Sequence, residues 1–122
     1  MEIQNAKITD VSISMAEHGV LTFWLGLEGG GWGCNYGGRC IGKGHRGADE
    51  FTADNGDGLV AMMEIMNVVG VDRWEDLKGK YVRCEIKGWG DGIDKIGNIL
   101  NNQWFDIREF FNRGAADGTN DE

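Results

Sequence analysis

The sequence has no proline, so its 21 glycines have to provide the turns. Its three cysteines are an odd number without a Cys-x-x-Cys pair, and neither of its two histidines lies at zinc-ligand spacing from them. This scarcity argues against a disulfide framework and against a metal site. No apolar run reaches about 18 residues and no signal peptide is visible, so we expect a cytoplasmic protein that has no membrane partner.

Positive charge is also scarce, because 12 Lys and Arg residues stand against 20 Asp and Glu, which gives a net charge of −8. Proteins bind a nucleic-acid backbone through a basic footprint, so this balance argues against DNA or RNA as a partner. A small anionic ligand remains open, because a few arginines in one pocket can outweigh the global field locally. An acidic protein that imitates nucleic acid also remains open.

The length of 122 residues predicts a single domain, which we place at residues 1–112. Residues 113–122 have no apolar periodicity and are predicted to form a disordered tail. A chain of this size buries only about 65–70% of its unfolded surface. We therefore expect additional stability from self-association into a homo-oligomer.

Alternation of apolar and polar side chains predicts several strands. Residues 6–15 alternate with a period of two, and the more apolar residues 20–27 follow after Gly19, so the two segments predict a hairpin. The glycine-rich residues 31–41 are a candidate third strand, in which glycine permits bulges and close backbone approach. Residues 80–90 alternate again and predict a later strand.

Helical spacing of apolar residues predicts one long helix at residues 59–70, with Asp57 as its N-cap. A capping-box pattern, Asp72 followed by Glu75, predicts a short helical turn. Residues 103–111 form an aromatic C-terminal anchor. The predicted fold class is therefore α+β, with a mostly antiparallel sheet, one long helix and a short aromatic C-terminal segment.

Two glycine motifs match nucleotide-binding patterns only in part. Residues 37–44, GGRCIGKG, fit G-x-x-x-x-G-K, but Gly44 stands where a Ser or Thr hydroxyl would hold Mg²⁺. Residues 42–47 fit G-x-G-x-x-G, but neither motif is followed directly by a helix whose N-terminus would face phosphates. No arrangement of a nucleophile with a base can be built either, so we expect neither an enzyme nor a cofactor.

What remains is a set of residue types that suit a small nucleotide. Aromatic faces stack on bases, arginines bind phosphates, and glycine-rich strands expose backbone N–H groups to oxyanions. Each tryptophan, taken singly, is also explained by a place in the core or in a subunit interface. The candidate ligand-binding residues are Trp32, Tyr36, Arg39, Arg83, Trp89, Asn98, Asn102, Phe105 and Arg108.

Three segments resemble a family of small phage and prophage proteins: EHGVLTFWL (17–25), WEDLKGKYVR (74–83), and IGNI (96–99) followed by WFD (104–106). This layout is similar to that of the Thoeris anti-defence sponges, which bind a cyclic ADP-ribose signal made by bacterial TIR domains and sequester it without cleavage. The resemblance implies an α+β protomer, an oligomer with nucleotide pockets at its subunit interfaces, and the cytoplasm of an infected bacterial host. Residues 42–58 have no counterpart that aligns with this family.

The leading hypothesis is therefore a phage protein that sequesters a cyclic ADP-ribose-type nucleotide. An aromatic side chain would stack on adenine, arginines would contact the phosphates, and asparagines would contact ribose hydroxyls. In that order, the candidates are Trp32, Trp89 or Phe105; Arg39, Arg83 and Arg108; and Asn98 or Asn102. The alternative is an acidic phage inhibitor that blocks a host defence complex, of the anti-CRISPR or anti-restriction kind, by direct protein binding. An accessory protein without a ligand is the third possibility.

Overall fold

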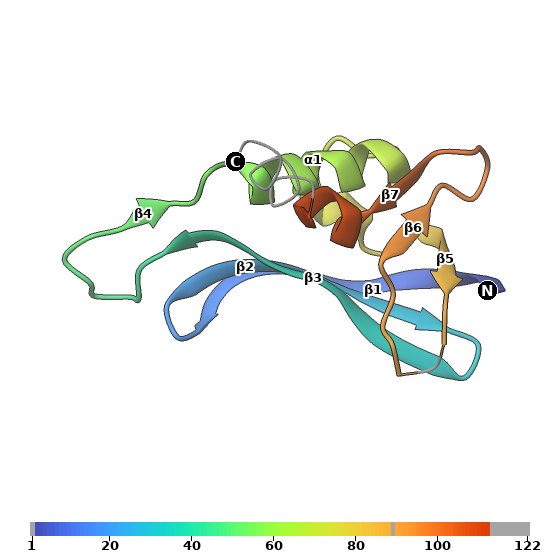
Figure 1. Cartoon of the computed structure of the whole chain (residues 1–122), viewed down its shortest axis with the longest axis horizontal. Helices are drawn as coiled ribbons and strands as arrows, with labels where there is room; N and C mark the ends of the chain where they lie inside the picture. The colour runs from blue at the N-terminus through green and yellow to red at the C-terminus, as the bar shows by residue number, and fades with distance from the viewer. Residues whose placement is uncertain (1, 89, 113–122) are drawn as a thin grey trace, which may run out of the picture.

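The computed structural model describes residues 2–88 and 90–112, and the predicted tail at 113–122 lies outside them. One sheet of seven strands has the order β4-β3-β2-β1-β5-β6-β7, and every pair in it is antiparallel. Helix α1 covers one face of this sheet (Figure 1). The predicted α+β class with a mostly antiparallel sheet is confirmed.

The elements are β1 (Glu2–Glu17), β2 (Val20–Gly29), β3 (Trp32–Lys43), β4 (Thr52–Ala53), α1 (Asp57–Val69), the 3₁₀ turn η1 (Trp74–Leu77), β5 (Tyr81–Ile86), β6 (Lys95–Gly97), β7 (Trp104–Asp106), and a helical segment at residues 107–112.

The core forms where the apolar face of the sheet meets α1. Strands β1, β2 and β3 are longer than predicted and pair as two consecutive hairpins. In β5 the predicted alternation is confirmed, because Val82, Cys84 and Ile86 are buried. The helix turns Ala61 and Ile65 onto the same core. These contacts join residues distant in the sequence into one apolar cluster.

Both predicted N-terminal helix caps are wrong, whereas the predicted end of the long helix at Gly70 is confirmed, because Gly70 is its C-cap and donates its N–H to the Met66 carbonyl. The N-cap of α1 is Gly56, with a φ of 98° and no side-chain cap, and Asp57 is the first helical residue. Glycine takes this left-handed conformation without the steric cost that Asp would carry. At η1 the N-cap is Arg73, and Glu75 forms an ion pair with its guanidinium at 2.8 Å, so no capping box forms at residues 72–75.

Tyr36 connects the two ends of the curved sheet. Its side chain is 1% exposed, and its hydroxyl donates to the Asp94 carbonyl at 2.9 Å and lies 3.4 Å from the Phe105 carbonyl. Asp94 and Phe105 lie at β6 and β7, four and five places away from β3 in the strand order. The sheet must therefore curl enough to bring its opposite parts together around the core.

This contact predicts a loss of stability at high pH that depends on Tyr36. Burial raises the pKa of the Tyr36 hydroxyl far above its ordinary value of 10.0. Because the folded pKa lies above the unfolded one, the stabilisation is complete below pH 10 and is lost as the pH rises further. We expect Tyr36→Phe to cost about 1–2 kcal/mol at pH 7 and to remove part of this alkaline loss.

Urea denaturation between pH 7 and pH 11 measures both effects. Tyr81 is the matched control, since it is the only other tyrosine and is exposed. Tyr81→Phe should keep the stability at pH 7 and the whole alkaline loss. Identical pH profiles for the two variants would contradict the assignment to Tyr36.

Candidate functional site

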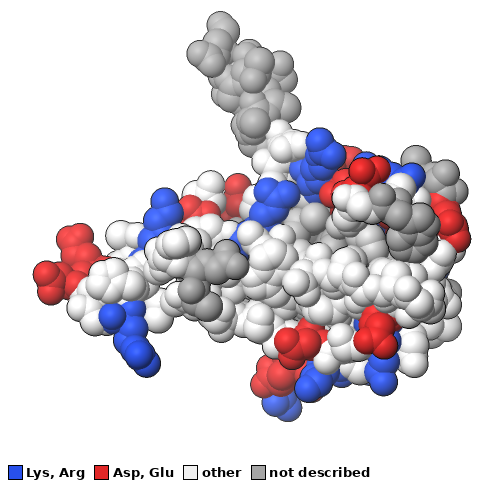
Figure 2. Space-filling view, turned by 90° about the horizontal axis from the view of Figure 1, so that it is seen from below, with Lys and Arg blue, Asp and Glu red and all other residues white. Residues whose placement is uncertain are grey.

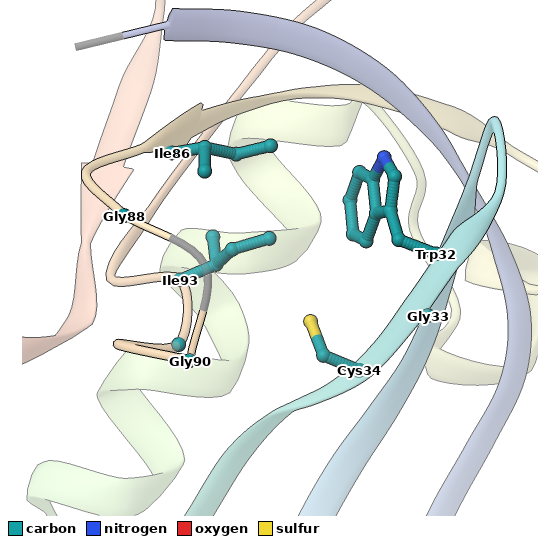
Figure 3. Close-up of a pocket in the computed structure, with 8 residues that line it drawn as sticks. Trp32, Gly33, Cys34, Ile86, Gly88, Gly90 and Ile93 are labelled. Atoms are coloured by element: carbon teal, nitrogen blue, oxygen red, sulfur yellow. The ribbon is translucent and has the colours of Figure 1, made fainter.

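A cavity of about 290 Å³ lies between the start of β3 and the segment that joins β5 to β6 (Figure 3). We call it the Trp32 cavity. It is apolar, and four of its eight lining residues are glycines, which contribute only main chain. The lining residues are Trp32, Gly33, Cys34, Ile86, Gly88, Gly90, Gly92 and Ile93.

Trp32 forms one wall and is held in place from two sides. Its ring lies against Gly29, where an added Cβ would come closer than 3.0 Å to the indole. Its Nε1 donates to Oε1 of Gln4 at 2.7 Å, and the Gln4 amide in turn donates to the Glu2 carboxylate at 2.6 Å. The indole is therefore oriented before any ligand arrives, which reduces the entropic cost of binding.

The opposite wall comes from the end of β5 and the glycine-rich segment after it. Ile86 and Ile93 extend from this side toward the indole of Trp32 (Figure 3). Gly90 and Gly92 have φ values of 97° and 77°, a conformation that favours glycine. The result is an aromatic wall that faces branched aliphatic side chains, an arrangement suited to a flat, apolar ring.

The Cys34 thiol points into the cavity (Figure 3). Burial raises the pKa of Cys34, and burial together with the nearby Cys34 raises the pKa of Cys84 to about 12. Both thiols are therefore protonated at neutral pH, and a protonated thiol is a poor nucleophile. The described lining holds no charged side chain.

Two cations meet at Asp94, the residue that follows Ile93 of the cavity lining. The Lys87 ammonium lies 3.2 Å and the Arg108 guanidinium 3.9 Å from the same carboxylate oxygen. Both side chains are partly exposed, so each ion pair is weak and open to exchange. Asp94 thus brings two cations close to one carboxylate, one residue along the chain from the cavity lining.

Among the predicted site residues, Trp32 lines this cavity and Tyr36 and Phe105 belong to the core. Tyr36 is 1% and Phe105 6% exposed, so neither offers a face on which a base can stack. The hydroxyl of Tyr36 is already bonded to main-chain carbonyls. We therefore leave both residues out of the candidate site.

Three other predicted site residues stabilise the segment between β6 and β7: Arg83, Asn98 and Asn102. Arg83 donates to the carbonyl of Asn98 at 2.8 Å and lies 4.4 Å from the ring centre of Trp104. The Asn98 amide donates to the Val68 carbonyl at 2.9 Å, and Asn102 accepts a hydrogen bond from Trp104 at 3.0 Å. These side chains are used within the protomer, and none of them lines the Trp32 cavity.

Arg39 does not line the cavity. The Arg39 guanidinium lies 4.7 Å from the ring centre of Phe111, on the C-terminal helical segment. Trp89 lies outside the described residues. The structure thus groups Trp32 with an aliphatic wall, and Arg108 pairs with Asp94, the residue after Ile93 of that wall.

Sequence reasoning missed several residues that build the site. Ile86 and Ile93 look like ordinary core positions, and Lys87 looks like a solvent-facing strand residue. The spacing of Gly88, Gly90 and Gly92 was a visible signal of exposed main chain after a strand. Nothing in the sequence identified Gln4 as the partner of Trp32, because they lie 28 positions apart.

The described residues contain no group of three or more His, Cys, Asp or Glu side chains that could hold a metal ion. No helix in the described part of the chain has both the length and the apolar character needed to cross a membrane. No protein-family profile, curated protein or solved structure matches this chain. Function therefore has to be argued from the cavity itself.

Proposed function

We propose that this protein binds and sequesters a small cyclic nucleotide of the ADP-ribose type without cleaving it, in the cytoplasm of a phage-infected bacterial host. The observation that carries this proposal is the Trp32 cavity, with an oriented indole opposite two isoleucines. Stacking of a base on an aromatic side chain contributes about 1–3 kcal/mol. A slot with one aromatic and one aliphatic wall suits a nucleobase better than a sugar or a phosphate.

The size of the cavity supports a ligand that is only partly enclosed by one protomer. Pockets for small molecules have volumes of about 300–1,000 Å³, and the Trp32 cavity lies just below that range. A base would fill it, and the phosphates would extend outside. Lys87 and Arg108 pair with Asp94, the residue that follows Ile93 of the lining, so we assign the phosphates to these two cations.

A second protomer would complete the site in this proposal. The chain is acidic, and Lys87 and Arg108 are already paired with Asp94, so one protomer alone would bind a diphosphate weakly. The outer side of α1 carries Leu59 and Met63, which are 52% and 60% exposed, and Asp57 and Glu64 are the only charged residues of that helix. Such an apolar face supports self-association into a homo-oligomer that shares its ligand sites.

Charge placement favours this proposal over an acidic inhibitor that occupies a nucleic-acid groove. Such a mimic would spread carboxylates across one continuous face. The sheet face turned away from α1 is largely uncharged, and its acidic and basic side chains lie mixed at the margins (Figure 2). We therefore do not pursue direct blocking of a host defence complex.

A capture-and-release experiment tests the proposal. The purified protein is incubated with the cyclic ADP-ribose signal produced by a TIR domain, freed of unbound ligand and denatured by heat. We expect mass spectrometry to find the intact signal in the released fraction, and light scattering to find a multimer. Failure to capture the signal contradicts the proposal, and release of a cleaved product identifies an enzyme instead.

A further inference from the structure

Strand β3 has a free edge along most of its length. Its partner on one side is β2, and on the other side β4 pairs only with Gly42 and Lys43. The residues of β3 from Gly33 to Cys40 therefore have no strand beside them on that side among the described residues, and the Ile41 carbonyl accepts a hydrogen bond from the Asp54 N–H. Gly33 lies in this stretch and also lines the Trp32 cavity.

The hairpin register determines which main-chain groups face the free edge. Gly30 and Gly31 form a two-residue turn, and Gly29 and Trp32 pair across it. The residues that flank a two-residue turn exchange hydrogen bonds, and such pairs alternate along an antiparallel ladder. Cys34 therefore bonds to β2, whereas Gly33 directs its N–H and C=O away from β2.

The identity of Gly33 is not explained by the fold. It lacks the positive φ of Gly31, and among the described residues a Cβ added to it would meet only the Leu27 carbonyl, at an ordinary 3.4 Å. By contrast, a Cβ on Gly29 would collide with Trp32. A side chain is thus sterically possible at position 33, and its absence leaves the main-chain edge beside the cavity uncovered.

A base stacked on Trp32 would bring polar atoms into the cavity, where the described side chains offer little to bind them. The Nε1 of Trp32 is already bonded to Gln4, and the other lining side chains are aliphatic or a thiol. Buried polar groups without a partner weaken binding. The ligand's donors and acceptors would therefore have to meet main-chain groups.

We infer that the N–H and C=O of Gly33 form a paired hydrogen bond with the donor–acceptor edge of the base, as an added strand would. This inference rests on the proposed function and explains how the site would select its ligand. The ligand would carry a nucleobase with a hydrogen-bond donor next to an acceptor, as the amino group and ring nitrogen of adenine provide. Main-chain hydrogen bonds supply this recognition, and the cavity supplies the stacking.

Amide hydrogen exchange of the wild-type protein tests the inference directly. The probe is the cyclic ADP-ribose signal, with quenching of tryptophan fluorescence as an independent readout of binding. Without ligand, the Gly33 amide should exchange fast and the Cys34 amide slowly. With ligand, exchange at Gly33 should slow at least tenfold while Cys34 changes little. Ligand binding that leaves Gly33 unprotected overturns the inference, whereas no binding at all overturns the proposed function.

A pair of substitutions at the same position gives a second test. Gly33→Pro removes the N–H, which β2 does not use, and proline is tolerated on an edge strand when its nitrogen faces outward. Gly33→Ala keeps the N–H and is the matched control. We expect Gly33→Pro to weaken binding at least tenfold more than Gly33→Ala, whose methyl group covers part of the edge but leaves the N–H in place. Equal affinities of the two folded variants overturn the inference, and the exchange measurement decides if Gly33→Pro does not fold.

Discussion

Replacing Gly58 with alanine is expected to destabilise the protein by about 2–3 kcal/mol, although alanine is the better helix former. Propensity alone predicts a gain of about 1 kcal/mol in the interior of a helix. At Gly58, however, an added Cβ would come closer than 3.0 Å to the carbonyl oxygen of Cys40 in β3. Main chain cannot rotate away as a side chain can, so α1 would have to move off the sheet and loosen the core around Ala61 and Ile65.

Urea denaturation at pH 7 measures this effect, and Gly30→Ala is the matched control. A Cβ on Gly30 would have no other atom of the described residues within 4 Å, and Gly30 has no positive φ. Its substitution should change the free energy of unfolding by less than about 0.5 kcal/mol. An unchanged denaturation midpoint for Gly58→Ala would mean that α1 and β3 are not packed as closely as described here.

The sequence predicted those parts of the fold that depend on local pattern. Alternation located β5, because Val82, Cys84 and Ile86 face the core regardless of what lies beyond. The hairpin of β1 and β2 and the position of α1 followed for the same reason. The predicted N-cap of α1 failed because side-chain type alone does not determine the backbone conformation: Gly56 takes the left-handed conformation as N-cap, and Asp57 follows it as the first helical residue.

The candidate site depends on contacts that local pattern does not contain. Tyr36 and Trp32 lie on the same strand among glycines and are equally plausible stacking residues in the sequence. Curvature of the sheet gives them different environments. It buries Tyr36 against Asp94, whereas Trp32 lines the cavity. The glycine-rich stretch thus has two uses: room for packing at Gly29, and an uncovered main-chain edge at Gly33.

Trp32→Ala is expected to weaken nucleotide binding about 100-fold, which corresponds to about 2.7 kcal/mol. Alanine removes the stacking surface and opens one wall of the cavity to water. Trp32→Phe keeps an aromatic face but loses the hydrogen bond to Gln4, so its affinity should lie between that of the wild type and that of Trp32→Ala. Gly29→Ala keeps the tryptophan but displaces its ring, because the added Cβ would collide with the indole, and it should also weaken binding at least tenfold.

Titration calorimetry with the cyclic ADP-ribose signal measures these affinities, and Trp24→Ala is the matched control. Trp24 is a half-buried tryptophan of the neighbouring strand whose ring lies over Gly38, and it does not line the cavity. Its removal should leave the affinity unchanged within about threefold if the core remains intact. Equal losses for Trp24→Ala and Trp32→Ala would point to a general loss of structure, whereas full binding by Gly29→Ala would exclude the indole wall as the stacking surface. Only the graded series, with Trp32→Phe between wild type and Trp32→Ala, is consistent with a base held against an oriented indole.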